Sequence, residues 1–93
     1  MYYAYVLKSC KTGRLYKGSC EDLDIRLRRH NTGFVRSTRP YRPWILLHSE
    51  CFETRGEAVQ REHFWKSATG ARELRRLLPS GWRASECAPD CRG

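Results

Sequence analysis

The chain has 93 residues, enough for one domain with a modest hydrophobic core. Its 18 lysine and arginine residues outnumber 10 acidic residues, and the net charge of +8 is typical of a polyanion-binding protein, although a basic protein without an anionic partner remains the alternative. The longest uncharged early run, residues 2–7, ends at Lys8, so we expect neither a membrane span nor a secretory signal, and hence a cytoplasmic protein with no membrane partner.

The first predicted elements are two short strands that form a hairpin. Residues 2–9 are mostly aromatic or aliphatic, residues 10–13 contain a glycine, and residues 14–18 resume the apolar pattern. Two such runs around a glycine-containing turn predict a β-hairpin. Since Tyr5 and Tyr16 lie on its two arms, we expect their rings to reach a common surface.

A first helix is predicted over residues 22–31, ended by Gly33. Leu23, Leu27 and His30 fall on one stripe at helical spacing, and Arg26 lies at the border of that stripe. Arg26 and His30 are therefore expected on the same side of the helix, near the buried seam. Two prolines make residues 32–43 an irregular loop.

Residues 44–52 begin with the apolar run WILL, which predicts a third strand buried on both faces. A capping box starting at Thr54 predicts a second helix to about residue 68, with Gly70 as its breaker. Glu62 lies in the middle of the face of this helix that should pack inward, where a carboxylate needs a partner or a function.

A last short helix is expected over residues 71–78, and Pro79 ends it. The predicted domain covers residues 1–78, and residues 79–93 have no periodic pattern and are expected to form a flexible tail. The five cysteines are odd in number and form no C-x-x-C pair, so we expect reduced thiols rather than a disulfide framework or a zinc site.

Arginine supplies 14 of the 18 basic residues, and its planar guanidinium group binds two phosphate oxygens at once. Several of these residues lie in the loop or project away from the buried stripe, and Lys17 must face opposite to Tyr16 on its strand. The expected nucleic-acid-binding residues are Lys17, Arg28, Arg29, Arg36, Arg39 and Arg42.

The ordered residues resemble a known family. Two strand tyrosines, then D-L-x-x-R-L-x-x-H-N and then E-A-x-x-x-E, are similar to a GIY-YIG nuclease domain, especially its small UvrC-like members. The resemblance covers residues 1–78. It departs from the family pattern at Tyr3-Ala4-Tyr5, which lacks the named glycine and isoleucine, and at Tyr16-Lys17-Gly18, where lysine replaces an apolar residue.

The resemblance implies an α/β (α+β) fold with a small three-stranded antiparallel sheet flanked by helices, in the order β-β-α-β-α-α. It also implies a metal-dependent endonuclease that uses Mg²⁺ or Mn²⁺ and acts on duplex or branched DNA, in DNA repair or processing. The residues at matching positions, expected to be catalytic, are Tyr5, Tyr16, Arg26, His30 and Glu62, with Glu62 as the metal ligand.

The chemistry of these residue types agrees with hydrolysis of a phosphodiester. Glu62 would supply an oxygen ligand for Mg²⁺ or Mn²⁺, which would stabilise the leaving oxygen, and Arg26 would neutralise the phosphoryl oxygens. Tyr5 would take the proton from the attacking water, provided that Arg26 or the metal lowers its pKa. Tyr16 and His30 would position the water or the phosphate.

Each residue also has a plainer interpretation. The tyrosines could be ordinary sheet aromatics, and Arg26 could be one more solvated charge. His30 could be a helix-end histidine favoured by the helix dipole, and Glu62 could pair with Lys66. The ordered set favours the nuclease. The alternative function is a nucleic-acid-binding module of the same fold with little activity alone.

Overall fold

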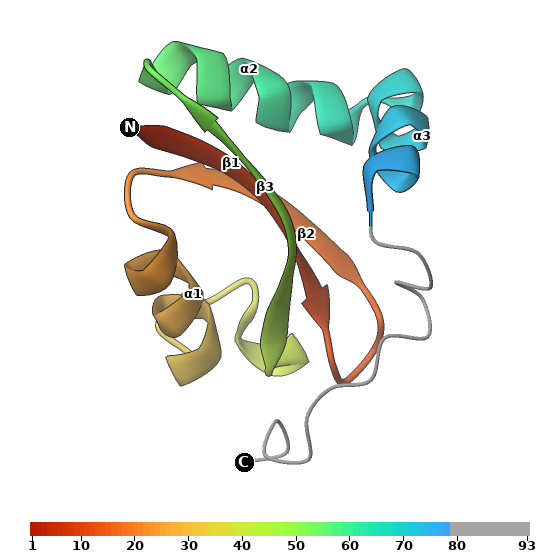
Figure 1. The fold of residues 1–93 in the computed structure, drawn as a ribbon. Coiled ribbons are helices and arrows are strands. Elements are labelled where there is room, and N and C mark those ends of the chain that lie inside the picture. The colour runs from red at the N-terminus through yellow and green to blue at the C-terminus, as the bar shows by residue number, and fades with distance from the viewer. Residues whose placement is uncertain (79–93) are drawn as a thin grey trace.

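The computed structural model describes residues 1–78, which form three antiparallel strands with helices on both faces of the sheet (Figure 1). The strands are β1 (Tyr2–Ser9), β2 (Leu15–Cys20) and β3 (Trp44–Phe52). The helices are α1 (Leu23–Thr32), the short 3₁₀ turn η1 (Arg39–Tyr41), α2 (Arg55–Lys66) and α3 (Ala68–Leu77). This order confirms the expected β-β-α-β-α-α fold.

The central strand of the sheet is β1, because the strand order is β2-β1-β3. It pairs with both neighbours in antiparallel register, and Tyr5 lies opposite Gly18 of β2 and Ser49 of β3. The expectation that residues 44–52 are buried on both faces is wrong, because β3 is an edge strand and its Leu46 is 41% exposed. The apolar run of β3 does not show whether the strand lies at the centre or at the edge of the sheet, because that position depends on how the strands pair.

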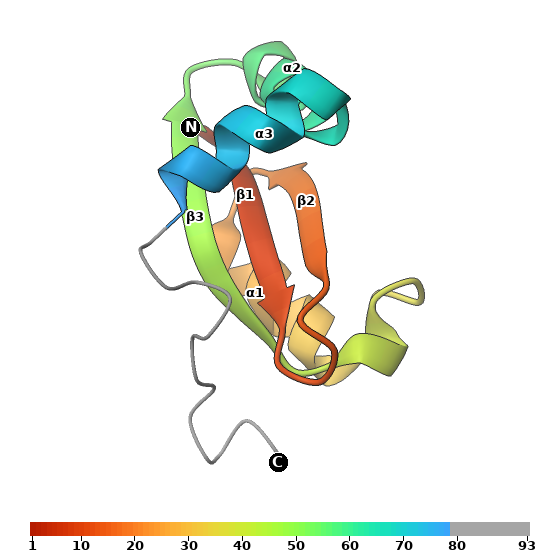
Figure 2. The ribbon, with the colours of Figure 1, turned by 90° about the vertical axis from the view of Figure 1, so that its right-hand side faces the viewer.

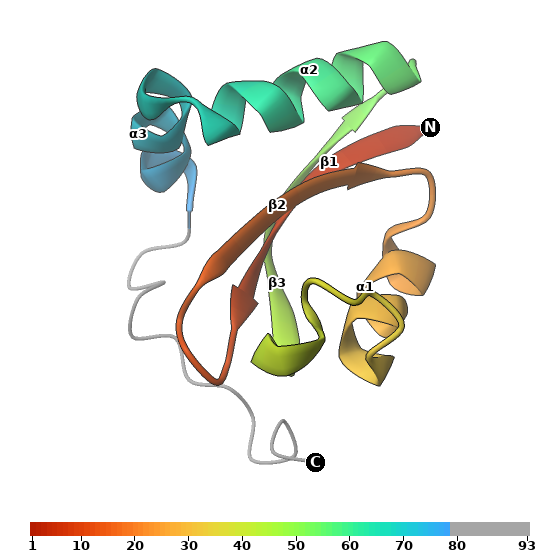
Figure 3. The ribbon, with the colours of Figure 1, turned by 180° about the vertical axis from the view of Figure 1, so that it is seen from behind.

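The two faces of the sheet carry separate hydrophobic cores, as the alternation of side chains along β1 requires. Ala4 and Val6 face α2 and α3, where Trp65 and Leu74 complete the first core. The second core, on the opposite face, contains Tyr5, Leu7, Cys20 and Trp44, against which Leu23 and Leu27 of α1 pack. Figures 2 and 3 show the two helical layers on the two sides of the sheet. Tyr5 therefore faces α1.

The caps of α1 agree with the sequence within one residue. Asp22 is the N-cap, and its carboxylate accepts a hydrogen bond from the backbone amide of Ile25 at 3.1 Å. Gly33 ends the helix with a φ of +84°, a left-handed conformation that glycine adopts without strain. Gly33 thus fixes the end of α1 that carries His30.

The junction between α2 and α3 differs from the expectation. The capping box of Thr54 and Glu57 is present, but the break occurs at Ser67 rather than at Gly70. Ser67 has an extended backbone, and its hydroxyl accepts a hydrogen bond from the amide of Gly70 to start α3. Gly70 lies buried inside α3, where a Cβ atom would overlap the carbonyl oxygen of Phe64. Its role is close packing of the two helices.

Cys20 and Cys51 are free thiols, as expected. Cys10 is disulfide-bonded, so the expectation of a reduced thiol is wrong at this position. The predicted tail, with Cys87 and Cys91, lies outside the described residues. Within residues 1–78, every helix is too short or too polar to cross a membrane.

Candidate active site

Three aromatic rings meet on the α1 face of the sheet. The ring of Tyr5 lies 6.2 Å from that of Tyr16 and 6.1 Å from that of His30, and the rings of Tyr16 and His30 are 4.8 Å apart. The expectation that the two tyrosines share a surface is thus confirmed. Gly18 makes this possible, because a Cβ atom there would lie 2.6 Å from the Tyr5 hydroxyl oxygen and 3.0 Å from the Tyr16 ring.

A chain of hydrogen bonds runs from Tyr5 into the loop after α1. The Tyr5 hydroxyl lies 3.2 Å from Nε2 of His30, and Nδ1 of His30 lies 2.8 Å from the hydroxyl of Thr38. That hydroxyl donates its proton to the carbonyl oxygen of Val35 at 3.3 Å. Since a hydroxyl has one proton, Thr38 must accept from Nδ1–H, and Nε2 is left to accept from the Tyr5 hydroxyl.

His30 is completely buried, and this burial, with the charge of Arg26, lowers its pKa to about 4. The ring is therefore neutral at pH 7, which agrees with its acceptor role toward Tyr5. The simpler interpretation of a charged histidine favoured by the helix dipole does not fit this environment. Thr38, which fixes the tautomer, was not predicted as a site residue, because no spacing in the sequence distinguishes it from the other polar loop residues.

Burial also raises the pKa of the Tyr5 hydroxyl, and the neighbouring Tyr16 raises it further. Arg26 opposes these effects, as expected, but burial outweighs it, and Glu62 adds to the rise. Tyr5 is therefore a neutral phenol in the free protein at pH 7. Tyr16, Arg26 and Glu62, which come from β2, α1 and α2, therefore lie near enough to act electrostatically on the Tyr5 hydroxyl, and His30 of α1 is hydrogen-bonded to it.

Glu62 approaches from the other helical layer and contacts the edge strand β2. Its Oε1 accepts a hydrogen bond from the Ser19 hydroxyl at 2.9 Å, and its Oε2 lies 2.7 Å from Nζ of Lys66. The expected pairing with Lys66 is present, and Ser19, for which no contact with Glu62 was predicted, is an additional partner. Because Tyr16 and Ser19 point to opposite faces of β2, the site spans the edge of that strand.

A divalent metal ion fits the donor chemistry at Glu62. Mg²⁺ and Mn²⁺ prefer oxygen ligands and commonly bind through one or two carboxylates, keeping several water molecules. The Lys66 ammonium group already places a positive charge at one carboxylate oxygen, so the position accepts a cation. Over residues 1–78, no cluster of three or more His, Cys, Asp or Glu residues could hold a metal by itself.

The loop arginines fall into two groups. Arg39 donates from Nε to the carbonyl oxygen of Gly33 at 2.8 Å, and Arg42 donates from Nε to that of Arg39 at 3.0 Å, so both brace the loop. Arg28, Arg29 and Arg36 are exposed, and Arg29 lies over the exposed ring of Phe34. Of the loop and helix arginines expected to bind nucleic acid, Arg28, Arg29 and Arg36 are therefore more available for contact than Arg39 and Arg42.

Lys17 lies on the opposite face of β2 from Tyr16, as expected. It is half-buried between the sheet and the helices α2 and α3, and burial lowers its pKa. The positive charges of Arg75 and Lys66 lower the pKa of Lys17 further, so both charges lie near Lys17. Of these cations, Lys66 pairs directly with Glu62.

Comparison with known proteins identifies the family of the chain. The family model described as the GIY-YIG catalytic domain matches residues 1–75. A UPF0213 protein of Bacillus pumilus is 46% identical over 69 residues, which cover 73% of this chain and 69% of that protein. A UPF0213 protein of Staphylococcus aureus is 36% identical over 75 residues, covering 80% of this chain and 90% of that protein.

A solved structure supports the same assignment. The solution NMR structure of a UPF0213 protein from Bacillus halodurans is 32% identical and has a TM-score of 0.50, covering 83% of this chain and 85% of that one. The departures from the named motif at Tyr3-Ala4-Tyr5 and Tyr16-Lys17-Gly18 therefore do not remove the chain from the family. The chain belongs to the GIY-YIG family, whose members are generally nucleases, and within it to the small UPF0213 proteins.

Proposed function

We propose that the protein is a metal-dependent endonuclease that hydrolyses phosphodiester bonds of DNA. The observation that carries this proposal is the cluster of Tyr5, Tyr16 and His30, with Arg26 and Glu62 near enough to act electrostatically on the Tyr5 hydroxyl. Such a group combines proton acceptors, a guanidinium group and a carboxylate, which are the functions that phosphodiester hydrolysis requires. The expected role in DNA repair or processing stays a prediction, as does the cytoplasmic location.

In this mechanism Tyr5 acts together with His30. Because the phenol is neutral and donates to Nε2 of His30, it can accept a proton from water while its own proton moves to the imidazole. The water oxygen forms a new bond to phosphorus, the bond from phosphorus to the leaving oxygen breaks, and solvent protonates that oxygen. The negative charge of the bound phosphate raises the pKa of His30 and so favours this transfer.

Arg26 and Glu62 would handle the charge on the substrate. The guanidinium group of Arg26, already close enough to act on Tyr5, would bind the phosphoryl oxygens. Glu62 would hold Mg²⁺ or Mn²⁺, which when bound stabilises the leaving oxygen as a Lewis acid. The Lys66 ammonium would then release Oε2 of Glu62.

Nicking of supercoiled plasmid tests the proposal. We expect nicking with Mg²⁺ or Mn²⁺ and none with EDTA. Glu62→Gln and Arg26→Ala should each reduce the rate by about 100-fold or more, the scale seen when one charge-stabilising group is removed. Glu73→Gln, which changes an exposed carboxylate on α3, is the matched control and should nick normally. Unchanged nicking by both site variants would overturn the proposal.

A nucleic-acid-binding module with little activity alone is the second candidate. Two observations favour it: Tyr5 is only 1% exposed, and Lys66 occupies one oxygen of Glu62. Activity requires that substrate binding opens access to the Tyr5 hydroxyl. Binding of DNA in a gel shift, with no nicking under any metal condition, would select this module over the nuclease.

A further inference from the structure

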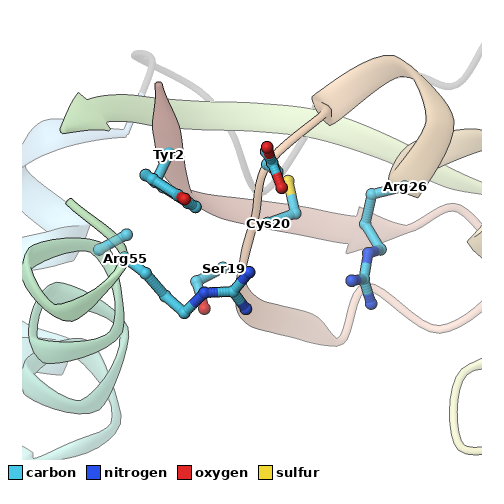
Figure 4. A pocket seen from close by; sticks show the side chains of 7 residues that line it. Tyr2, Ser19, Cys20, Arg26 and Arg55 are labelled. Carbon is cyan, nitrogen blue, oxygen red and sulfur yellow. The ribbon is translucent and has the colours of Figure 1, made fainter. Parts of the chain in front are cut away.

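A cavity lies beside the cluster of Tyr5, Tyr16 and His30, and the mechanism above does not use it. It has a volume of about 150 Å³ and lies between the start of α2 and the end of β2 (Figure 4). Arg26 and Ser19 line it, so it adjoins the candidate active site, whereas Tyr5 and Glu62 do not line it. A space of this size holds a phosphate group with its water molecules.

Two arginines from different helices reach this cavity. Figure 4 shows Arg55 extending from α2 toward Ser19, while Arg26 enters from α1. Neither guanidinium group forms a hydrogen bond or an ion pair with another residue among residues 1–78. The guanidinium group of Arg55 lies 5.4 Å over the ring of Tyr2, which also lines the cavity and helps to hold that side chain in place.

The chemistry of the cavity suits an anion with several oxygens. Guanidinium groups bind phosphate by two parallel hydrogen bonds, and the hydroxyl of Ser19 supplies a further polar group. The one acidic residue at the cavity, Glu21, is exposed and pairs with neither arginine within residues 1–78. Two cations facing one cavity without a carboxylate partner repel each other, so a bound anion would relieve that repulsion.

We propose that Arg55 binds a backbone phosphate of the nucleic acid, next to the phosphate that is cleaved. The proposal rests on the proposed function, because Arg26 would hold the reacting phosphate and also borders this cavity. A nucleic-acid strand that runs from the cluster of Tyr5, Tyr16 and His30 past Arg26 would reach Arg55 at the other side of the cavity. The substrate must therefore extend at least one nucleotide beyond the cleaved bond on the α2 side.

The first test does not depend on nuclease activity. Inorganic phosphate is titrated into ¹⁵N-labelled protein, and the NMR signals of the Arg55 Nε–H group and of the Ser19 and Cys20 amides are followed. We expect these signals to move in the wild type and the amide shifts to disappear in Arg55→Ala. Arg72→Ala, an exposed arginine on α3 at the other end of α2, is the matched control and should keep them. Glu21→Gln should bind phosphate more tightly, because it removes a negative charge from the cavity.

The second test measures binding to duplex DNA without metal, in the Glu62→Gln background, at several salt concentrations. Loss of one phosphate contact lowers the slope of log affinity against log salt by about 0.9. We expect this change for Arg55→Ala and no comparable change for Arg72→Ala. Equal slopes for the two variants, or equal phosphate shifts in the NMR titration, would overturn the assignment.

The two proposals can fail separately. If plasmid nicking is absent but phosphate and DNA binding depend on Arg55, the phosphate site stands and the nuclease does not. If nicking depends on Glu62 and Arg26 while Arg55→Ala behaves like Arg72→Ala, the nuclease stands and the second phosphate site is wrong.

Discussion

At the scale of single residues, His30 links the stability of the fold to the chemistry of the site. It is fully buried, accepts from Tyr5 and donates to Thr38, so the neutral ring satisfies both hydrogen bonds. A protonated ring would place a charge in this buried position, near the positive charge of Arg26. The protein should therefore resist protonation of His30 until the pH is well below 6.

We predict that the free energy of unfolding falls as the pH is lowered from 6.5 to about 4. In this window the unfolded chain protonates its histidine near pH 6.5 while the folded chain does not until about pH 4, so acid favours unfolding. The full shift corresponds to about 3 kcal/mol, and His30 adds no pH dependence above 6.5. Urea unfolding at pH 7 and pH 4.5 measures the loss.

The control for this prediction is His30→Gln, which cannot titrate. Glu50, whose pKa is lowered by hydrogen bonds to His48 and Arg61, also loses stabilising interactions in acid, so the wild type alone does not isolate His30. The difference in the pH dependence of unfolding between the wild type and His30→Gln isolates the contribution of His30. Equal pH dependence in wild type and His30→Gln would contradict a neutral buried His30.

That the candidate residues Tyr5, Tyr16 and His30 lie close together could be predicted from sequence, but their protonation states could not. Tyr5, Tyr16 and Glu62 stand out through residue type, order and spacing. The burial that raises the pKa of Tyr5 depends on β1 being the central strand, and Ser19 becomes a partner of Glu62 only through the packing of α2 on β2. Both are consequences of tertiary structure, which local patterns do not encode.

At the scale of elements, Gly70 at the junction of α2 and α3 allows close packing of the two helices instead of ending a helix. Helix propensity treats glycine as a breaker, which is why Gly70 was expected to end the second helix. The break is at Ser67, because its side chain caps α3 while its extended backbone ends α2. Gly70 instead lets the first turn of α3 approach the carbonyl group of Phe64.

We predict that Gly70→Ala destabilises the protein by about 3 kcal/mol, at the upper end of the usual cost of overpacking. The added methyl group would overlap the backbone oxygen of Phe64, so the helices must separate. On propensity alone the same change would stabilise the helix by about 1 kcal/mol. Thermal or urea unfolding shows directly whether Gly70→Ala lowers or raises the free energy of unfolding.

Gly56→Ala is the matched control, because Gly56 also lies in a helix, α2, but a Cβ atom there would meet nothing within 4 Å. This variant should be stabilised by up to about 1 kcal/mol. If both variants are stabilised, Gly70 does not lie as close to the carbonyl group of Phe64 as described above. If only Gly70→Ala is destabilised, the packing of α3 on α2 limits the stability of the layer that carries Glu62.

At the scale of the whole molecule, the net charge of +8 does not say which surface meets nucleic acid. Basic residues occur on α1, the following loop, α2 and α3, and some already have structural partners. Arg61 pairs with Glu50, and Arg39 braces the loop. The side chains of Arg28 and Arg36 are exposed and make no hydrogen bond or ion pair with any other residue in the described part of the chain.

The last prediction separates local charge from net charge. The double variants Arg28→Ala/Arg36→Ala and Arg72→Ala/Arg76→Ala each remove two charges, so both lower the net charge from +8 to +6. If the α1 side binds DNA, the first double variant should lower the salt slope of DNA binding by up to about 1.8, two phosphate contacts, and the second should change it little. Equal losses would mean that only net charge matters. A larger loss in the second variant would indicate that the nucleic acid binds on the α3 side, where Arg75 lies near Lys17.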